Sequence, residues 1–185
     1  MKRVLDKHLI RQMMKEKRLQ MDRKTFSLYD QNIYNLVLQH PYVQNSKMIA
    51  CYVSLPNEVD TLALIETFLK TKSVCVPRVE GTIMHFYQID SLDELQVGHF
   101  HVLEPTTSRK VLSQDIDIML VPMMAFDGRK YRVGYGKGYY DKYFASGYQG
   151  YKLGLAYAMQ YVNEIAVDEY DYALDEIITE SDILK

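Results

Sequence analysis

The stretch from Arg132 to Asp141, RVGYGKGYYD, holds the residues of this chain that are best suited to chemistry. Glycines alternate here with larger residues, a lysine stands between two of them, and an aspartate follows two tyrosines. Because glycine has no Cβ, backbone N–H groups can converge closely on a ligand, and such concave amide arrays bind anions, phosphate above all. Lys137 adds a mobile point charge that suits phosphate. The stretch predicts an anion-binding loop; a tight turn that needs glycine only for positive φ is the alternative.

The spacing separates this loop from two common phosphate-binding motifs. No Ser or Thr follows Lys137 and the glycine spacing differs from that of a P-loop. The third glycine comes one residue too early for the dinucleotide-binding fingerprint. A helix expected from about Gly138 would add its positive N-terminal end to the site.

Several other side chains near this chemistry have two interpretations each. Asp141 can complement the dipole of the helix, or it can bind Mg²⁺, since a carboxylate beside a phosphate site needs a cation between the two charges. Glu58 follows a predicted buried strand at its carboxyl end, where ligands bind in open α/β sheets, although a solvated loop acid is the more frequent case. Tyr135, Tyr139 and Tyr140 either pack in the core or face a flat ring system.

The elements that must position these residues follow from the pattern of apolar residues. Helices are expected over 2–20, 22–39, 62–70 and from the glycine loop to near Gly147. Strands are expected over 48–54, 73–79, 84–89, 116–123 and 152–157, and the polar residues 90–115 indicate loop with short elements. Strands that alternate with helices are typical of an α/β fold with a largely parallel sheet. With no repeat or linker, we expect one domain over 1–185.

The first expected helix carries a basic face. Lys7 and Arg11 are four residues apart, so they share a face and can reach one target together. On spacing alone, a solvated basic face is the more frequent arrangement. The apolar side of this helix is expected to hold Leu5, Leu9, Met13 and Leu19.

Composition limits the classes of function. The 185 residues are 48% hydrophobic and 25% charged, with a formal net charge of -2, which argues against a general polyanion-binding protein. Cys51 and Cys75 lie in apolar runs without metal-ligand spacing and are expected to be core residues in a reducing compartment. The sequence shows no signal-peptide pattern and no membrane-length apolar run, so the cytoplasm is the expected location.

The glycine loop, following the phrase VPMMAFD, resembles that of the 5-formyltetrahydrofolate cyclo-ligase family, also called 5,10-methenyltetrahydrofolate synthetases. Their signature has the form R-hydrophobic-G-x-G-x-G-aromatic-Y-D. The resemblance extends over nearly the whole chain and includes the segments KHLIR, YVSLPNEVDT, VCVPRV and YDYALDEIIT. Position 135 is Tyr here, where many members carry Arg.

The resemblance implies a three-layer α/β/α fold like that of ribose-5-phosphate isomerase and CoA transferases. It also implies a reaction in which ATP and 5-formyltetrahydrofolate become 5,10-methenyltetrahydrofolate, ADP and phosphate, with Mg²⁺. The formyl oxygen would attack the γ-phosphate to give an N5-iminium phosphate, and N10 would then close the ring as phosphate leaves. The implied partners are these small molecules, without nucleic acid or membrane, and the expected state is a monomer or weak dimer.

The resemblance also implies roles for individual residues. Lys137, Arg132 and Tyr139 would be catalytic, with Lys137 at the phosphoryl group being transferred. Folate would lie against Val53, Glu58, Tyr135 and Tyr139, with Glu58 accepting hydrogen bonds from pterin N–H groups. Mg²⁺ would be held by Asp141 and Asp171, with Asp175 as the alternative to Asp171. The residues expected to bind ATP are Lys7, Arg11, Arg132, Val133, Gly134, Tyr135, Gly136, Lys137, Gly138, Tyr139 and Tyr140.

Two other functions remain open at this level. One is a nucleotide-binding module that regulates without catalysis, against which Lys137, Asp141 and Glu58 argue. The other is a different enzyme on the same fold, an isomerase that needs a general base or a CoA transferase that needs a nucleophilic carboxylate. Glu58 has the chemistry for either role, but fold analogy is weak evidence for function.

Overall fold

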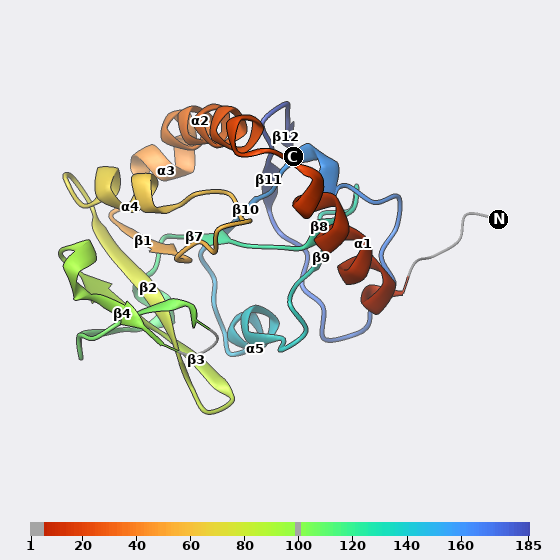
Figure 1. Ribbon diagram of the computed structural model, residues 1–185. Helices are drawn as coiled ribbons and strands as arrows, with labels where there is room; N and C mark the ends of the chain where they lie inside the picture. The colour runs from red at the N-terminus through yellow and green to blue at the C-terminus, as the bar shows by residue number, and fades with distance from the viewer. Residues whose placement is uncertain (1–5, 99–100) are drawn as a thin grey trace.

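A computed structural model describes residues 6–98 and 101–185, and Figure 1 shows helices on both sides of a central sheet. The strands of this sheet are β1 (Met48–Cys51), β2 (Ser73–Glu80), β3 (Ile83–Ile89), β6 (Lys110–Val111), β7 (Ile118–Val121), β10 (Tyr151–Leu155), β11 (Glu176–Ile178) and β12 (Ile183–Leu184). They lie in the order β12-β11-β10-β7-β1-β2-β3-β6. The run from β11 to β2 is parallel, β12 and β3 pair antiparallel with its two edges, and β6 pairs antiparallel with β3. The sheet is mixed but mostly parallel, which confirms the predicted fold class.

Alternate residues of the central strands pack into separate cores on the two faces of the sheet. The helices are α1 (Lys7–Gln20), α2 (Arg23–Gln39), α3 (Pro41–Asn45), α4 (Leu62–Phe68) and α5 (Tyr139–Ala145). Ile49 and Cys51 of β1 belong to the core under α2, α3 and α4, whereas Ala50 belongs to the core that contains Phe144 of α5. This alternation follows from the period of two along a strand. The result is the predicted three-layer arrangement (Figure 1).

Helix α1 differs most from its prediction. It begins at Lys7, with the Asp6 side chain accepting a hydrogen bond from the His8 amide, and residues 2–5 lie outside the described residues. Its buried stripe is Ile10, Met14 and Arg18. The predicted apolar side is wrong at Leu9, which is 46% exposed, and at Leu19, which is 78% exposed, whereas Met13 is half-buried and Leu5 lies outside the described residues. The reason is the partner of the helix: Ile10 and Met14 pack on a hairpin of β8 (Ala125–Phe126) and β9 (Arg132–Val133) rather than on the main sheet.

Other boundaries shift for local reasons. Strand β1 ends before the predicted residue 54, because the carbonyl of Tyr52 accepts the Thr61 hydroxyl at 2.6 Å. The strands predicted over 116–123 and 152–157 correspond to β7 and β10, which are both shorter than predicted. Pro41 ends α2 as expected, yet it also opens the unpredicted α3, where its fixed φ suits the first helical turn. Residues 90–115 hold short elements as predicted, including β4 (Leu95–Val97) and β5 (Leu103–Pro105).

The structure describes the surroundings of the two cysteines and the length and polarity of the helices. Cys51 and Cys75 are buried and not in disulfides, and burial raises the pKa of both thiols. In the described part of the chain, every helix is too short or too polar to cross a membrane.

The order of the strands creates a place for a ligand. The chain leaves β1 through α4 to β2 on one side, and it leaves β7 through α5 to β10 on the other side. Helices α4 and α5 pack on opposite faces of the sheet. Adjacent strands whose connections diverge in this way leave a crevice outside their carboxyl ends, where open α/β sheets bind ligands.

Candidate active site

A cavity of about 570 Å³ lies at that switch point. Its wall includes Val53 just beyond β1 and Pro122 just beyond β7. Every residue given a role in the sequence analysis lines it, apart from the alternative Asp175. The lining residues are Lys7, Arg11, Tyr52, Val53, Leu55, Glu58, Pro77, Val79, Met84, Val102, Glu104, Pro122, Arg132, Val133, Gly134, Tyr135, Gly136, Lys137, Gly138, Tyr139, Tyr140, Asp141 and Asp171.

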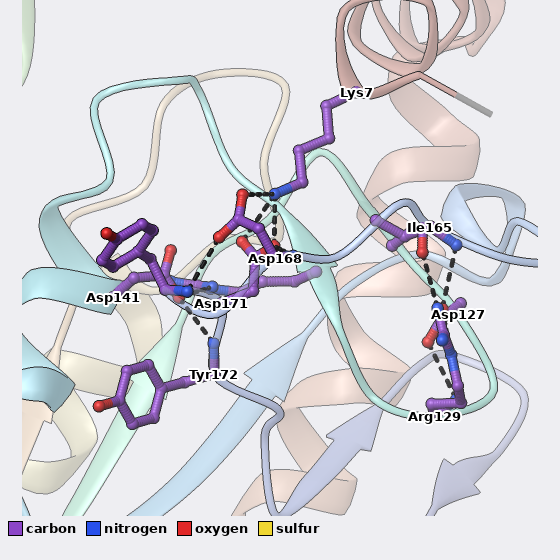
Figure 2. Close-up of polar contacts among 10 residues, drawn as sticks. Lys7, Asp127, Arg129, Asp141, Ile165, Asp168, Asp171 and Tyr172 are labelled. Carbon is purple, nitrogen blue, oxygen red and sulfur yellow. Dashed lines mark hydrogen bonds and ion pairs between the residues drawn. The ribbon is translucent and has the colours of Figure 1, made fainter. Parts of the chain in front are cut away.

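The hairpin β8–β9 delivers the glycine loop to this cavity, and a buried carboxylate fixes the hairpin turn. The oxygens of Asp127 accept hydrogen bonds from the Arg129 guanidinium at 2.7 Å and from the Ile165 amide at 3.1 Å (Figure 2). Asp127 has no exposed surface. With its turn held in this way, β9 places Arg132 at the cavity wall, where the residue is only 6% exposed.

Two glycines of the loop have a positive φ, which both the anion-binding interpretation and the tight-turn alternative allow. Gly136 and Gly138 have φ of 104° and 66°, in the left-handed region that glycine adopts without steric cost. The Arg11 Nε donates a hydrogen bond to the carbonyl of Gly134 at 2.8 Å, which ties the loop to α1. A Cβ on Gly136 would lie 3.5 Å from the Arg11 guanidinium carbon. Lys7 and Arg11 both line the cavity beside the loop, although Lys7 contacts Asp171 and Arg11 contacts the Gly134 carbonyl.

Beside the loop, two carboxylates are each paired with a cation, and Figure 2 shows the pair of Lys7 with Asp171. Asp171 accepts Lys7 Nζ at 2.7 Å through Oδ1. Asp141 accepts Arg132 Nη1 at 2.9 Å and the Tyr172 amide at 3.2 Å, both through Oδ1. These are the carboxylates predicted to hold Mg²⁺, and they lie on the same side of the cavity as the loop.

The donor set at this end fits Mg²⁺. This cation prefers oxygen ligands and usually takes one or two protein carboxylates, with phosphate oxygens and water completing the shell. Asp141 and Asp171 supply two carboxylates that line one cavity. No group of three or more His, Cys, Asp or Glu suited to a metal occurs within residues 6–98 and 101–185. Asp175 lies elsewhere, accepting the Lys152 amide at 2.7 Å with Lys152 Nζ 3.1 Å away.

The opposite end of the cavity holds one buried carboxylate. Glu58 follows β1, as predicted, and is only 7% exposed. Its Oε1 accepts the Tyr135 hydroxyl at 2.5 Å, and its Oε2 accepts the Leu55 amide at 2.8 Å. Burial raises the pKa of Glu58, while the hydrogen bonds from Leu55 and Tyr135 act in the opposite direction. The surrounding wall is apolar and includes Val53, Pro77, Val79 and Met84.

Sequence reasoning missed Arg18, which completes this end. Its Nη1 donates to the Tyr135 hydroxyl oxygen at 3.1 Å and its Nη2 to the Met123 carbonyl at 2.7 Å. The side chain is nearly inaccessible, with the residue 5% exposed. The available signal was its position, four residues after Met14 and eight after Ile10, so that an arginine continues an apolar stripe.

The three tyrosines of the loop combine the two interpretations left open by the sequence. Tyr139 and Tyr140 pack against the core under α5 and also line the cavity. Tyr135 is 46% exposed and lines the same cavity, with its hydroxyl between Arg18 and Glu58. One cavity thus joins a cationic, glycine-lined end suited to phosphates with an apolar end suited to a flat ring that donates N–H groups to a carboxylate.

Comparison with known proteins agrees with this chemistry. The family model described as "5-formyltetrahydrofolate cyclo-ligase family" matches residues 3–180. A 5-formyltetrahydrofolate cyclo-ligase of Mycoplasma genitalium is 30% identical, covering 95% of this chain and 98% of its own. That of Mus musculus is 31% identical over 78% of each chain.

Solved structures give the same result. A 5,10-methenyltetrahydrofolate synthetase from Aquifex aeolicus superposes with a TM-score of 0.87 and 32% identity, covering 96% of this chain and 91% of that one. The enzyme from Mycoplasma pneumoniae superposes with a TM-score of 0.78 and 29% identity, covering 95% and 99%. Motif, cavity, fold and relatives therefore agree, and the chain belongs to the 5-formyltetrahydrofolate cyclo-ligase family.

Proposed function

We propose that this cavity is where the protein, as an ATP-dependent ligase of its family, converts 5-formyltetrahydrofolate to 5,10-methenyltetrahydrofolate. In this proposal the ATP phosphates lie against the glycine loop and the pterin ring lies against Glu58. The observation that carries it is the joining of both ends in one cavity of about 570 Å³. A ligase that transfers a phosphoryl group to its second substrate needs the two substrates in contact.

At the phosphate end, the chain offers positive charge from several elements. Lys7 and Arg11 come from α1, Arg132 from β9 and Lys137 from the loop, and all four line the cavity. We assign Lys137 to the phosphoryl group in transfer, where a cation stabilises the charge that spreads over its oxygens. Asp141 and Asp171 would hold Mg²⁺, which when bound neutralises phosphate oxygens.

At the folate end, Glu58 has acceptor capacity to spare. A carboxylate offers about four lone-pair sites. The Tyr135 hydroxyl and the Leu55 amide each use one of them. The remaining sites match the N–H groups along one edge of a pterin. Val53 and Tyr139 line the same cavity and would contact the ring faces.

The reaction requires the formyl oxygen to become a leaving group. In the first proposed step this oxygen attacks the γ-phosphorus of ATP, the bond to the β-γ bridging oxygen breaks, and ADP leaves. The product is an N5-iminium phosphate. In the second step N10 attacks the iminium carbon, its proton passes to solvent, and the carbon–oxygen bond breaks to release phosphate. The protein aligns the formyl oxygen with the phosphorus and balances charge, which is the usual enzymatic contribution to phosphoryl transfer.

The test is a complete reaction mixture of protein, 5-formyltetrahydrofolate, ATP and Mg²⁺. We expect the near-ultraviolet absorbance of methenyltetrahydrofolate to appear, with one ADP and one phosphate released for each product. Omission of ATP is the matched control and should abolish the signal. Product without ATP would contradict the proposal, and nucleotide binding without product would favour a regulatory module.

Location and assembly remain proposals. The buried, unpaired Cys51 and Cys75 support a reducing compartment, for which we propose the cytoplasm. We also propose a monomer or weak dimer, which sedimentation at micromolar concentrations can test.

A further inference from the structure

Arg18, Tyr135 and Glu58 form a chain of hydrogen bonds whose direction is fixed by chemistry. A guanidinium can only donate, so the Tyr135 oxygen must accept from Arg18 Nη1 at 3.1 Å. The hydroxyl has a single proton, and this proton must then point to Glu58 Oε1 at 2.5 Å. Since Oε2 already accepts the Leu55 amide at 2.8 Å, both oxygens of Glu58 act as acceptors. The whole arrangement suits Glu58 as a carboxylate.

We propose that Arg18 and Tyr135 are positioning residues that keep Glu58 ionised and oriented toward the folate, an inference that rests on the folate-binding role proposed for Glu58. Neither residue needs to take part in the phosphoryl transfer. Each acts through Glu58. Tyr135 does so by direct contact, and Arg18 does so by its hydrogen bond to Tyr135 and by its charge.

Arg18 is the charged group among the described residues that favours the ionised form of Glu58. Three tyrosines from separate elements also interact with Glu58: Tyr52 next to β1 and Tyr140 of α5 with its charge, and Tyr157 after β10 with its backbone. The Tyr157 hydroxyl lies 3.0 Å from the Glu58 backbone carbonyl and 2.7 Å from Asp30 of α2. Burial raises the pKa of Tyr52 and Tyr140, which keeps their hydroxyls neutral beside Glu58. The groups that offset the cost of burying the Glu58 charge are therefore Arg18, Tyr135 and the Leu55 amide.

Arg18 is itself held in place, so the hydrogen bonds from Arg18 through Tyr135 orient Glu58 in addition to favouring its ionised form. Arg18 Nη2 donates a hydrogen bond to the Met123 carbonyl at 2.7 Å, just beyond β7. Ile10 and Met14, which share the buried stripe of α1 with Arg18, pack this helix on the hairpin. Tyr135 belongs to the glycine loop. The carboxylate at the folate end is thus held by a residue of the phosphate end, so the two ends share one hydrogen-bonded unit.

The test measures the dissociation constant of 5-formyltetrahydrofolate without ATP, from pH 5 to 9, in the whole protein. Tyr135→Phe keeps the ring and removes the hydroxyl. A hydrogen bond to a charged group contributes enough that we expect the acidic loss of binding to move up by about one pH unit, or about tenfold in affinity at a fixed acidic pH. Arg18→Met should move it in the same direction. In the Tyr135→Phe background Arg18→Met should shift the profile less than it does in the wild type, because only the direct effect of the Arg18 charge on Glu58 remains.

Two controls make the result decisive. Tyr161→Phe removes a hydroxyl outside the cavity and should leave the pH profile unchanged. Should Arg18→Met fail to fold, since Arg18 is buried, Tyr135→Phe carries the test. An unshifted profile for Tyr135→Phe, with Glu58→Gln weakening folate binding, would overturn the positioning role. Wild-type folate affinity in Glu58→Gln at every pH would instead overturn the folate role of Glu58 on which the inference rests.

Discussion

The two ends of the cavity handle charge in opposite ways. At the glycine-loop end each carboxylate has its own cation, Lys7 with Asp171 and Arg132 with Asp141. At the other end Glu58 is 7% exposed and is held by neutral hydrogen-bond donors, with Arg18 one residue further away. The half-buried Glu104 lines the same cavity and accepts the Val79 amide at 3.0 Å. The first end is a set of ion pairs and the second is a buried anion in a hydrogen-bonded frame.

This difference teaches how one cavity can receive two unlike substrates. The Lys7–Asp171 pair is partly open, with side chains 25% and 13% exposed, so Lys7 can turn to phosphate oxygens and Asp171 to Mg²⁺. A buried carboxylate cannot reorganise at low cost and must be oriented in advance. The phosphate end should accordingly respond to salt and Mg²⁺, and the folate end to pH.

The largest expected effect is the loss of the loop cation. Lys137→Ala should lower turnover by about 100- to 1000-fold, because charge stabilisation in the transition state is removed, while folate binding changes little. Steady-state kinetics with folate binding measured separately checks this. Near-normal turnover would refute the role of Lys137 and with it the catalytic half of the comparison.

The next effect concerns Mg²⁺ and has a matched control. Asp171→Asn should raise the Mg²⁺ concentration for half-maximal activity by about tenfold or more, since a ligand is lost. Asp175→Asn removes the same charge only four residues away, but Asp175 binds Lys152 and does not line the cavity. Its Mg²⁺ requirement should match that of the wild type. A raised Mg²⁺ requirement in Asp175→Asn, with a normal one in Asp171→Asn, would assign the ligand to Asp175 instead of Asp171.

A smaller effect separates the glycines of the loop. Gly136→Ala forces a side chain onto a φ of 104° and should cost about 1–2 kcal/mol of unfolding free energy, with weaker ATP binding. Gly134→Ala is the control, because its added Cβ would meet nothing within 4 Å and its φ lies outside the left-handed region. Denaturant unfolding of both variants compares them. Equal stability would show that the loop backbone tolerates a Cβ at either place.

The smallest effect is the pH dependence of stability from Glu58. The pKa of Glu58 is about 4.5 in the unfolded chain and is raised in the folded protein, mainly by burial. At a pH between the unfolded and the folded pKa, the folded state keeps a proton that the unfolded state has lost. Stability from this group is present below pH 4.5 and is lost as pH rises through the folded pKa, by at most about 1.4 kcal/mol per pH unit. Subtracting the Glu58→Gln curve isolates the effect. If the wild type instead gained stability relative to Glu58→Gln as the pH rises above 4.5, the raised pKa of Glu58 would be contradicted.

Much of the fold was predictable because it depends on local patterns. Apolar runs located the central strands, and the glycine loop and Glu58 could be placed at strand ends from the chain itself. The buried side of α1 could not, since it faces a hairpin built from residues more than a hundred positions away. The link from Arg18 through Tyr135 to Glu58 joins three segments that are distant in the sequence, and without it the two interpretations of Tyr135 stay open. Such contacts depend on tertiary packing, which local spacing does not encode.

The central claim, that the two ends of one cavity bind different substrates, is tested most directly by crossed calorimetric titrations. ATP with Mg²⁺ and 5-formyltetrahydrofolate are each titrated into the wild type and into Glu58→Gln. We predict that Glu58→Gln weakens folate binding about tenfold, because a hydrogen bond to a charged acceptor is lost, and leaves ATP binding unchanged. Equal loss of both affinities would contradict the account.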